Sequence, residues 1–392
     1  MEIEVWWLLA LPLFFGLGWL AARIDIRQVI HESRTLPRSY LNGLNFLLNE
    51  QPDKAIDAFL EAVEIDPQTV ELHFALGSLF RRRGEIERAI RIHQNLVERD
   101  DLAANERVTA LAALGEDYLK AGLLDRAEKV FLTLRETPSE AERATQALLQ
   151  IYQQEKDWRK AIDIAAALPD HQSMQWRREV AQFCCEQAQA ALESSDWDGA
   201  RTALEEALAI NPRCVRASIL LGDLCVAQGD DLAAIEHWKR IEAQDSPSLA
   251  LVGERVMTAF ERQGKTAQGQ TLIAAWLART PSIDLLDQVF RSVLAAEGPR
   301  AGYDLVREEL RRNPTLIGLS KFLEAASNAA PPEQQGDIEF IRQLIVEHTR
   351  RVVRYRCDAC GFKSRQFQWH CPACGGWETY PPRRTEEFDL EP

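Results

Sequence analysis

The chain has 392 residues, of which 46 are basic and 60 acidic, so its formal net charge is −14 at pH 7. This length allows two or three ordinary domains or one long repeat array. The acidic balance argues against nucleic-acid binding over the whole surface. The eight cysteines do not indicate a small secreted protein built on disulfides.

An apolar run lies near the N-terminus. Residues 5–22, VWWLLALPLFFGLGWLAA, contain no charge and would span about 27 Å as a helix, enough to cross a thin bilayer core. Two glutamates precede the run and four arginines follow it, which places the N-terminus outside the cytoplasm. The acidic start and the long apolar core argue against a cleaved signal peptide. The sequence therefore predicts a transmembrane anchor at residues 1–22 and a juxtamembrane linker at residues 23–35.

Residues 36–330 carry a helical pattern that repeats about every 34 residues. Each unit has the tetratricopeptide pattern, with a small residue in the first helix, small and aromatic residues in the second, and a closing proline. The small position of the second helix recurs at Ala55, Ala89, Ala127, Ala161, Ala200, Ala234, Gly269 and Tyr303. The pattern predicts about eight to nine units that stack into a right-handed superhelical solenoid, whose groove would bind peptides or proteins.

Single positions of the repeat also predict local structure. Glycines between the two helices of a unit indicate left-handed turns, and Lys156 occupies this place in the fourth unit. The eighth unit is degenerate, because Arg291 and Tyr303 occupy positions that should be small. Trp238 and Trp276 lie on second helices and are predicted core residues.

The thiols and histidines of the array predict packing rather than chemistry. Its cysteines lie in alanine-rich helical segments and are expected to be buried free thiols, typical of a reducing compartment: Cys184, Cys185, Cys214 and Cys225. Three histidines lie on helical faces without a recurring partner and are interpreted as packing or surface residues: His73, His93 and His237. Trp158 and Trp197 begin second helices and are also interpreted as packing residues. No nucleophile–base pair, phosphate loop or H-E-x-x-H motif is evident, so the sequence does not predict an enzyme.

Two C-x-x-C motifs, each followed by glycine, lie near the C-terminus within residues 354–382. Each motif can present two thiolates from a tight turn, and together they can close a tetrahedral site with four ligands: Cys357, Cys360, Cys371 and Cys374. Zinc is the usual ion for such a site and iron also fits. His370 is a weaker candidate ligand, because four cysteines complete the coordination.

The metal module is preceded by residues 331–353, which predict a helix that caps the array, and is followed by a tail at residues 383–392. A module of this size cannot fold on an apolar core, so the bound metal must stabilise it. The short connection predicts a module held rigidly against the last repeats.

The segment from Thr349 to Arg384 has eight basic and two acidic residues, a balance of +6 that leaves −20 for the rest of the chain. We interpret this contrast as intramolecular docking or solvated charge, with an anionic partner (phosphate, lipid headgroup or RNA) as the alternative.

The anchor, the repeats and the Y-R-C-x-x-C-G-F … W-x-C-P-x-C-x-x-W module together resemble the lipopolysaccharide assembly protein B family of Gram-negative bacteria. The most specific matches are Cys357, Cys360, Trp369, Cys371, Pro372, Cys374 and Trp377. The resemblance covers the whole chain. It implies a rubredoxin-like metal domain packed on the repeats of a single-pass inner-membrane protein, with its N-terminus in the periplasm and its C-terminal domain in the cytoplasm.

The same resemblance implies a function and partners. The chain would be an adaptor that helps the membrane protease FtsH degrade the deacetylase LpxC, and it would contact lipopolysaccharide transport or regulatory membrane proteins. A rubredoxin-type electron-transfer protein and a zinc-ribbon RNA-binding protein are the alternatives. Nucleic acid is not the expected partner, and the sequence leaves a homo-oligomer open.

Overall fold

The structure, a computed structural model, describes residues 38–49, 51–65, 69–169, 173–349 and 355–382. The predicted anchor, the juxtamembrane linker and the tail at residues 383–392 lie outside this part of the chain. Across the residues that the structure does describe, no helix has both the length and the apolar character needed to cross a membrane.

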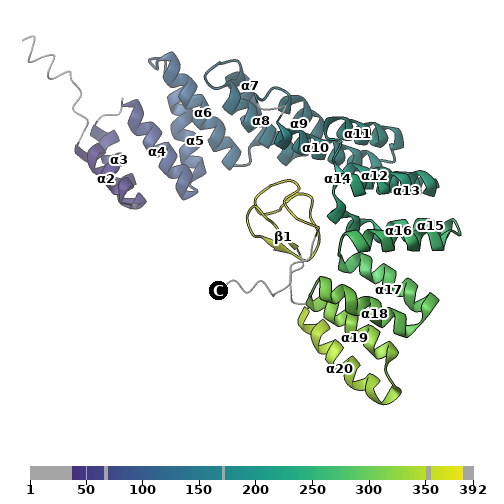
Figure 1. The fold of residues 1–392 in the computed structure, drawn as a ribbon. Helices are drawn as coiled ribbons and strands as arrows, with labels where there is room; N and C mark the ends of the chain where they lie inside the picture. The colour runs from purple at the N-terminus through teal and green to yellow at the C-terminus, as the bar shows by residue number, and fades with distance from the viewer. Residues whose placement is uncertain (1–37, 50, 66–68, 170–172, 350–354, 383–392) are drawn as a thin grey trace, which may run out of the picture. The chain divides into compact units, whose positions relative to one another are not determined.

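The chain divides into two compact units between Ile151 and Tyr152, within helix α8 (Ala141–Glu155). The other helices of the first unit are α2 (Arg38–Leu48), α3 (Pro52–Ile65), α4 (Val70–Arg83), α5 (Ile86–Val97), α6 (Ala104–Lys120) and α7 (Leu124–Arg135). The second unit continues with α9 (Trp158–Ala165), α10 (Met174–Glu193), α11 (Trp197–Ile210), α12 (Val215–Ala227), α13 (Asp231–Lys239), α14 (Ile241–Gln244), the 3₁₀ helix η1 (Ser246–Leu251), α15 (Gly253–Arg262), α16 (Thr266–Arg279), α17 (Ile283–Glu297), α18 (Pro299–Arg312), α19 (Leu316–Ala329) and α20 (Pro332–Thr349). Figure 1 shows these helices following one another along the chain.

The first unit is built from helical pairs, α2 with α3, α4 with α5, and α6 with α7. The predicted small positions Ala55, Ala89 and Ala127 have no exposed surface. Close approach explains the need for small residues: a Cβ added at Gly43 of α2 would lie 2.6 Å from the Phe59 ring of α3. Small residues therefore recur with the period of the repeat because each helical pair has such a close contact.

The second unit repeats this arrangement, with α10 on α11, α12 on α13, α15 on α16, α17 on α18 and α19 on α20. Trp238 and Trp276 are 1% and 0% exposed, which confirms that they are core residues. The segment formed by α14 and η1 was not predicted. It interrupts the array after α13, and Pro247 lies in the first turn of η1.

The predicted register is wrong by one residue in the eighth pair. Tyr303 is half-buried and its ring lies 5.1 Å from the ring of Phe322. The neighbouring Gly302 is buried, and a Cβ added there would lie 2.9 Å from the Phe290 ring. Gly302 is therefore the small residue, 33 rather than 34 positions after Gly269 (302 − 269). Spacing alone could not separate two adjacent residues, whereas the contact with Phe290 does.

The turns between paired helices follow the prediction, including its exception. Gly84, Gly122 and Gly264 have φ values of 82°, 72° and 68°. Lys156 adopts the same left-handed backbone with φ 58°, and so does Ser195 in the next pair with φ 62°. A Cβ is unfavourable in this region, so both side chains are held there at a cost that the packing of the adjoining helices offsets.

The C-terminal module departs from the all-α pattern. Strands β1 (Tyr355–Arg356) and β2 (Lys363–Ser364) pair antiparallel, with Tyr355 opposite Ser364. A small buried cluster supports them and consists of Tyr355, Cys357, Cys371 and Tyr380, with Phe367 packed against it.

Candidate metal centre and its docking surface

Two turns of the same design position the cysteines. In the first turn, the amide of Gly361 donates to the carbonyl of Cys357 at 2.8 Å; in the second, the amide of Gly375 donates to the carbonyl of Cys371 at 2.9 Å. Both glycines have positive φ, 76° and 70°, a conformation that glycine adopts without steric cost. Each C-x-x-C-G motif thus folds back on itself and directs its two sulfurs to the same side.

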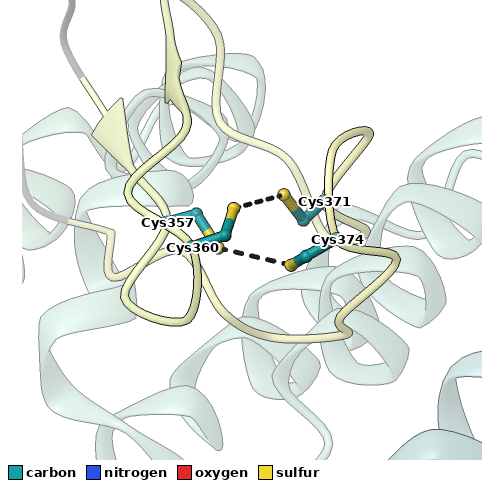
Figure 2. Close-up of side chains that lie close together, drawn as sticks. All are labelled: Cys357, Cys360, Cys371 and Cys374. Carbon is teal, nitrogen blue, oxygen red and sulfur yellow. Dashed lines mark hydrogen bonds between the residues drawn. The ribbon is translucent and has the colours of Figure 1, made fainter. Parts of the chain in front are cut away.

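The structure brings all four predicted cysteines together. Figure 2 shows the sulfurs of Cys360 and Cys371, 3.7 Å apart, and those of Cys357 and Cys374, 3.8 Å apart. All four Sγ atoms lie within 4.8 Å of one another. A tetrahedral zinc ion with Zn–S bonds of about 2.3 Å requires sulfur–sulfur separations of about 3.8 Å. The four thiols could therefore hold one tetrahedral ion with little rearrangement.

The electrostatics of the cluster allow all four thiolates to form only around a cation. Burial opposes ionisation of Cys357, but the hydroxyl of Thr379 and backbone amides lower the pKa of this thiol to about 6. The amide of Phe362 favours the Cys360 thiolate, yet burial and hydrogen bonds to the other cysteines raise the pKa of Cys360 to about 12. Four thiolates this close cannot all form unless a positive charge lies between them. A divalent ion supplies that charge, and the donor set suits zinc and iron alike.

The site has a buried and an exposed side. Cys357 and Cys371 are buried, whereas Cys360 and Cys374 are exposed. His370 is outside the group of four ligands; its ring lies 4.3 Å from the ring of Trp377. The histidine therefore packs on the tryptophan, and the tryptophan connects the site to the repeats.

An aromatic cluster joins the module to α9 and α10. The ring of Trp377 lies edge-on to Trp158 at 6.3 Å and to Phe183 at 6.0 Å, while Trp158 and Phe183 stack at 5.9 Å. The prediction that the module rests on the last repeats is therefore incomplete, because these aromatic contacts lie on the fourth and fifth pairs. Chain connectivity suggested the last repeats, but the complementary aromatic side chains add a contact that connectivity does not indicate. Trp158 is the packing residue that was predicted, and Trp197 in the next pair is 39% exposed.

Polar contacts continue the same interface. The side-chain amide of Gln182, which has no exposed surface, donates to Glu378 at 2.6 Å. The Gln182 oxygen accepts a hydrogen bond from Arg216 at 3.3 Å, and Arg216 pairs with Glu186 at 2.8 Å. Burial raises the pKa of the Glu378 carboxyl above its usual range, although the hydrogen bond from Gln182 opposes this shift. Glu378 also has a left-handed backbone, with φ 52°.

Beside this interface, Trp369 packs on the apolar core of the later repeats. A cavity of about 530 Å³ remains between module and array, lined in part by Arg178, Arg213, Asp358 and Glu378. The module therefore contacts the array at several places and not through one side chain alone.

The four cysteines of the array are buried and free, which confirms the prediction. The sulfurs of Cys185 and Cys214 lie 3.8 Å apart, and the amide of Gln182 reaches Cys214 at 3.7 Å. Burial raises the pKa of Cys184 to about 12. Thiols with so little thiolate character are unreactive, so they act here as core residues beneath the docking surface.

A buried polar cluster in the first unit was missed by the sequence analysis. His93 has no exposed surface, and its Nδ1 lies 2.5 Å from Oδ2 of Asp117. The other carboxylate oxygen of Asp117, Oδ1, accepts a hydrogen bond from Arg81 at 3.0 Å. A Cβ added at Gly77 would lie 2.4 Å from the His93 ring. His93 is thus a packing residue, as interpreted, but it has a charged partner. An acidic residue at a periodic apolar position of α6 was the signal that could have identified Asp117.

Comparisons with known proteins agree with both parts of the chain. Residues 40–105 and 185–248 match the tetratricopeptide repeat family, and residues 355–382 match the rubredoxin metal binding domain family. The chain is 36% identical to lipopolysaccharide assembly protein B of Escherichia coli strain K12 over 378 residues, which covers 96% of this chain and 97% of that protein. It is 29% identical to the protein of the same name from Haemophilus influenzae, across 99% and 100% of the two chains.

Among solved structures, the complex of the yeast Sti1 TPR2AB domain with a pHSP90 peptide gives a TM-score of 0.32 at 20% identity, covering 68% of this chain and 97% of that chain. The Naa15/Naa10 complex bound to HypK-THB gives 0.40 at 14% identity, covering 80% and 53%. Similarity at this level adds nothing to the assignment made from the repeats.

Proposed function

Because the chain belongs to the lipopolysaccharide assembly protein B family, we propose that it is a non-catalytic adaptor in lipopolysaccharide assembly. The observation that carries this proposal is the combination, in one chain, of a tetratricopeptide array with a four-cysteine module docked on it. Repeat arrays of this kind present surfaces for other proteins and do not themselves supply a reaction centre.

We further propose that residues 5–22 anchor the chain in the inner membrane, with the N-terminus in the periplasm and the array in the cytoplasm. The uncharged run and the arginines after it support this topology. The adaptor would then bring the deacetylase LpxC to the membrane protease FtsH. Confinement to the membrane raises the effective concentration of a bound client near the protease without a new contact.

The second unit offers a surface for such a client. A cavity of about 870 Å³ is lined by residues of α12, α15, α17 and α19. Several of its charges are already paired within the array, for example Arg255 with Asp223 at 3.0 Å and Lys321 with Asp287. A client peptide would bind there by exchanging these pairs for its own charges and by covering apolar lining residues such as Leu251 and Ile317.

In this proposal the metal has a structural role. Cys357, Cys360, Cys371 and Cys374 would hold one ion, whose binding energy folds a module too small to fold alone. The folded module positions Trp377 against α9 and α10, so the ion acts on the array through packing.

The tethering step is tested by deleting residues 1–22. The truncated protein should remain folded and metal-bound, and LpxC should become as long-lived in cells as it is without the adaptor. A control variant that carries an unrelated single-pass helix in the same orientation should restore LpxC turnover. Normal turnover with the truncated protein would show that tethering is not the mechanism.

A second candidate function, electron transfer, is favoured by one observation: Cys360 and Cys374 are exposed, which would leave one side of a bound iron ion near the surface. Protein purified from its native cells distinguishes the two functions. Iron with a reversible colour change and a redox wave would support electron transfer, whereas stoichiometric zinc would exclude it.

A further inference from the structure

The exposed side chains that the structure describes on α2 carry no charge. Three leucines on this face are exposed, Leu41 by 51%, Leu44 by 36% and Leu48 by 80%. They recur at intervals of three and four residues, which places them on one side of the helix. Among the described side chains from residue 39 to residue 49, the other exposed ones are those of Asn42, Asn45 and Asn49.

The neighbouring helix shows what an ordinary exposed surface of this protein looks like. The exposed residues of α3 include Asp53, Lys54, Asp57 and Glu61, with a single exposed leucine, Leu60, at 38%. α2 packs on α3 through its other side, where Gly43 approaches Phe59. The leucine face of α2 is therefore separate from the core contact, and no helix of the described residues covers it.

The position of α2 in the sequence indicates what could cover this face. The apolar run ends at residue 22 and α2 begins at Arg38, so residues 23–37, fifteen in number, connect them. A chain of this length spans at most about 50 Å when fully extended. The connection contains three arginines and two acidic residues, Asp25 and Glu32, and α2 contains Arg38 and no acidic residue, so residues 23–48 have a balance of 4 − 2 = +2. This positive balance favours a surface of anionic lipid headgroups.

We propose that α2 docks on the bilayer surface, with Leu41, Leu44 and Leu48 in the interface between headgroups and acyl chains and the asparagines among the headgroups. This proposal rests on the proposed anchor at residues 5–22. An apolar helical face next to a segment of net positive charge is typical of interfacial helices. A helix of eleven residues would bind weakly by itself, but the anchor keeps it at a high effective concentration at the surface.

A second copy of the chain is the less favoured occupant. Stable protein interfaces bury about 1,200–2,000 Å² in total, which is more than one short helical face supplies. A lipid surface can bury three leucine side chains without a complementary shape. Docking of α2 would fix the first repeat at the membrane, so the adaptor would meet clients there with a restricted orientation.

Photocrosslinking of the full chain tests the docking. p-Benzoylphenylalanine is introduced at position 48 on α2 and, as a matched control, at position 60 on α3. Each protein is reconstituted in vesicles of phosphatidylethanolamine and phosphatidylglycerol, irradiated, and analysed by mass spectrometry. We expect lipid adducts at position 48 to exceed those at position 60 by about tenfold or more, because burying a leucine side chain corresponds to at least that factor.

Three results would overturn the proposal: equal lipid adducts at the two positions, crosslinks from position 48 to a second copy, or crosslinks from position 48 to residues 1–37. Flotation of the same vesicles tests the anchor separately. A chain that floats without lipid adducts at position 48 overturns only the docking, whereas a chain that does not float overturns the anchor as well. In the variant L41Q/L48Q, a probe at position 44 should lose most of its lipid adducts while flotation is unchanged.

Discussion

Replacing Trp377 with alanine tests whether aromatic packing holds the metal module on the array. In the structure this ring contacts Trp158 and Phe183 edge-on, at centroid distances of 6.3 and 6.0 Å. Each such pair contributes about 0.5–1.5 kcal/mol beyond area burial. The variant should therefore weaken docking by at least about 1–3 kcal/mol, before the loss of buried apolar area is added, which corresponds to an increase of at least about 5- to 150-fold in the undocked population.

Hydrogen–deuterium exchange of the metal-loaded full chain measures this population. Exchange in α9 and α10 should accelerate in Trp377→Ala, while exchange in α5 of the first unit stays unchanged. Thiolate charge-transfer absorption of the cobalt-substituted protein checks that the module itself still folds. Trp197→Ala is the matched control, because this tryptophan begins α11 as Trp158 begins α9 but is 39% exposed.

A double-mutant cycle with Phe183→Leu isolates the contact across the interface. The coupling energy between positions 377 and 183 should be about 0.5–1.5 kcal/mol. If Trp377→Ala changes exchange in α9 and α10 no more than Trp197→Ala does, or if the coupling is zero, the module is not held by this cluster and the reasoning fails.

Four further predictions follow from single residues. Lys156→Gly should stabilise the protein by about 0.5–1 kcal/mol in chemical denaturation, because the backbone there is left-handed (φ 58°); a loss of stability would contradict the strain. Gly77→Ala should destabilise it by about 1–3 kcal/mol, because the new Cβ would lie 2.4 Å from the His93 ring, and Gly336→Ala, which meets no neighbour within 4 Å, is the control. Glu378→Gln should tighten docking at neutral pH, because burial raises the pKa of Glu378. The contribution of Glu378 to docking is therefore fully present below its ordinary pKa of about 4.3 and is lost as pH rises through the raised folded-state value. Exchange measured from about pH 4.3 upward at constant metal content should thus vary with pH more in the wild type than in this variant. Cys357→Ser or chelation should lower metal content and release α9 and α10 together, and retained docking without metal would contradict the structural role of the ion.

The cysteine site could be predicted from the sequence because its determinants are local. Each C-x-x-C-G turn positions two sulfurs through hydrogen bonds within five residues, such as that from Gly361 to Cys357. The docking surface could not be predicted, because Trp377 and Phe183 are almost two hundred positions apart in the sequence and no short-range pattern links them. Connectivity indicated the later repeats, on whose core Trp369 packs, but it does not indicate which other helices the module contacts.

Within the repeats, too, local patterns could be predicted and contacts between distant residues could not. Ala55, Ala161 and Ala234 could be identified by period because each is buried at the corresponding position of its own helical pair. In the eighth pair the period could not distinguish Gly302 from Tyr303, and only the contact between Gly302 and Phe290 does so. The His93–Asp117 pair was missed because its members lie on different pairs of helices, so a search for partners nearby in the sequence could not join them.

The position of the module gives the metal an influence beyond its own thirty residues. Tyr355 belongs to the small cluster that surrounds Cys357 and Cys371, and it also lines the cavity of about 870 Å³ in the second unit. That cavity is the surface on which we expect a client to bind. If the ion is lost, the cluster that holds Tyr355 loses its support, and one wall of the cavity loses its position. Metal loss should therefore weaken client binding even where the repeats that line the rest of the cavity remain folded.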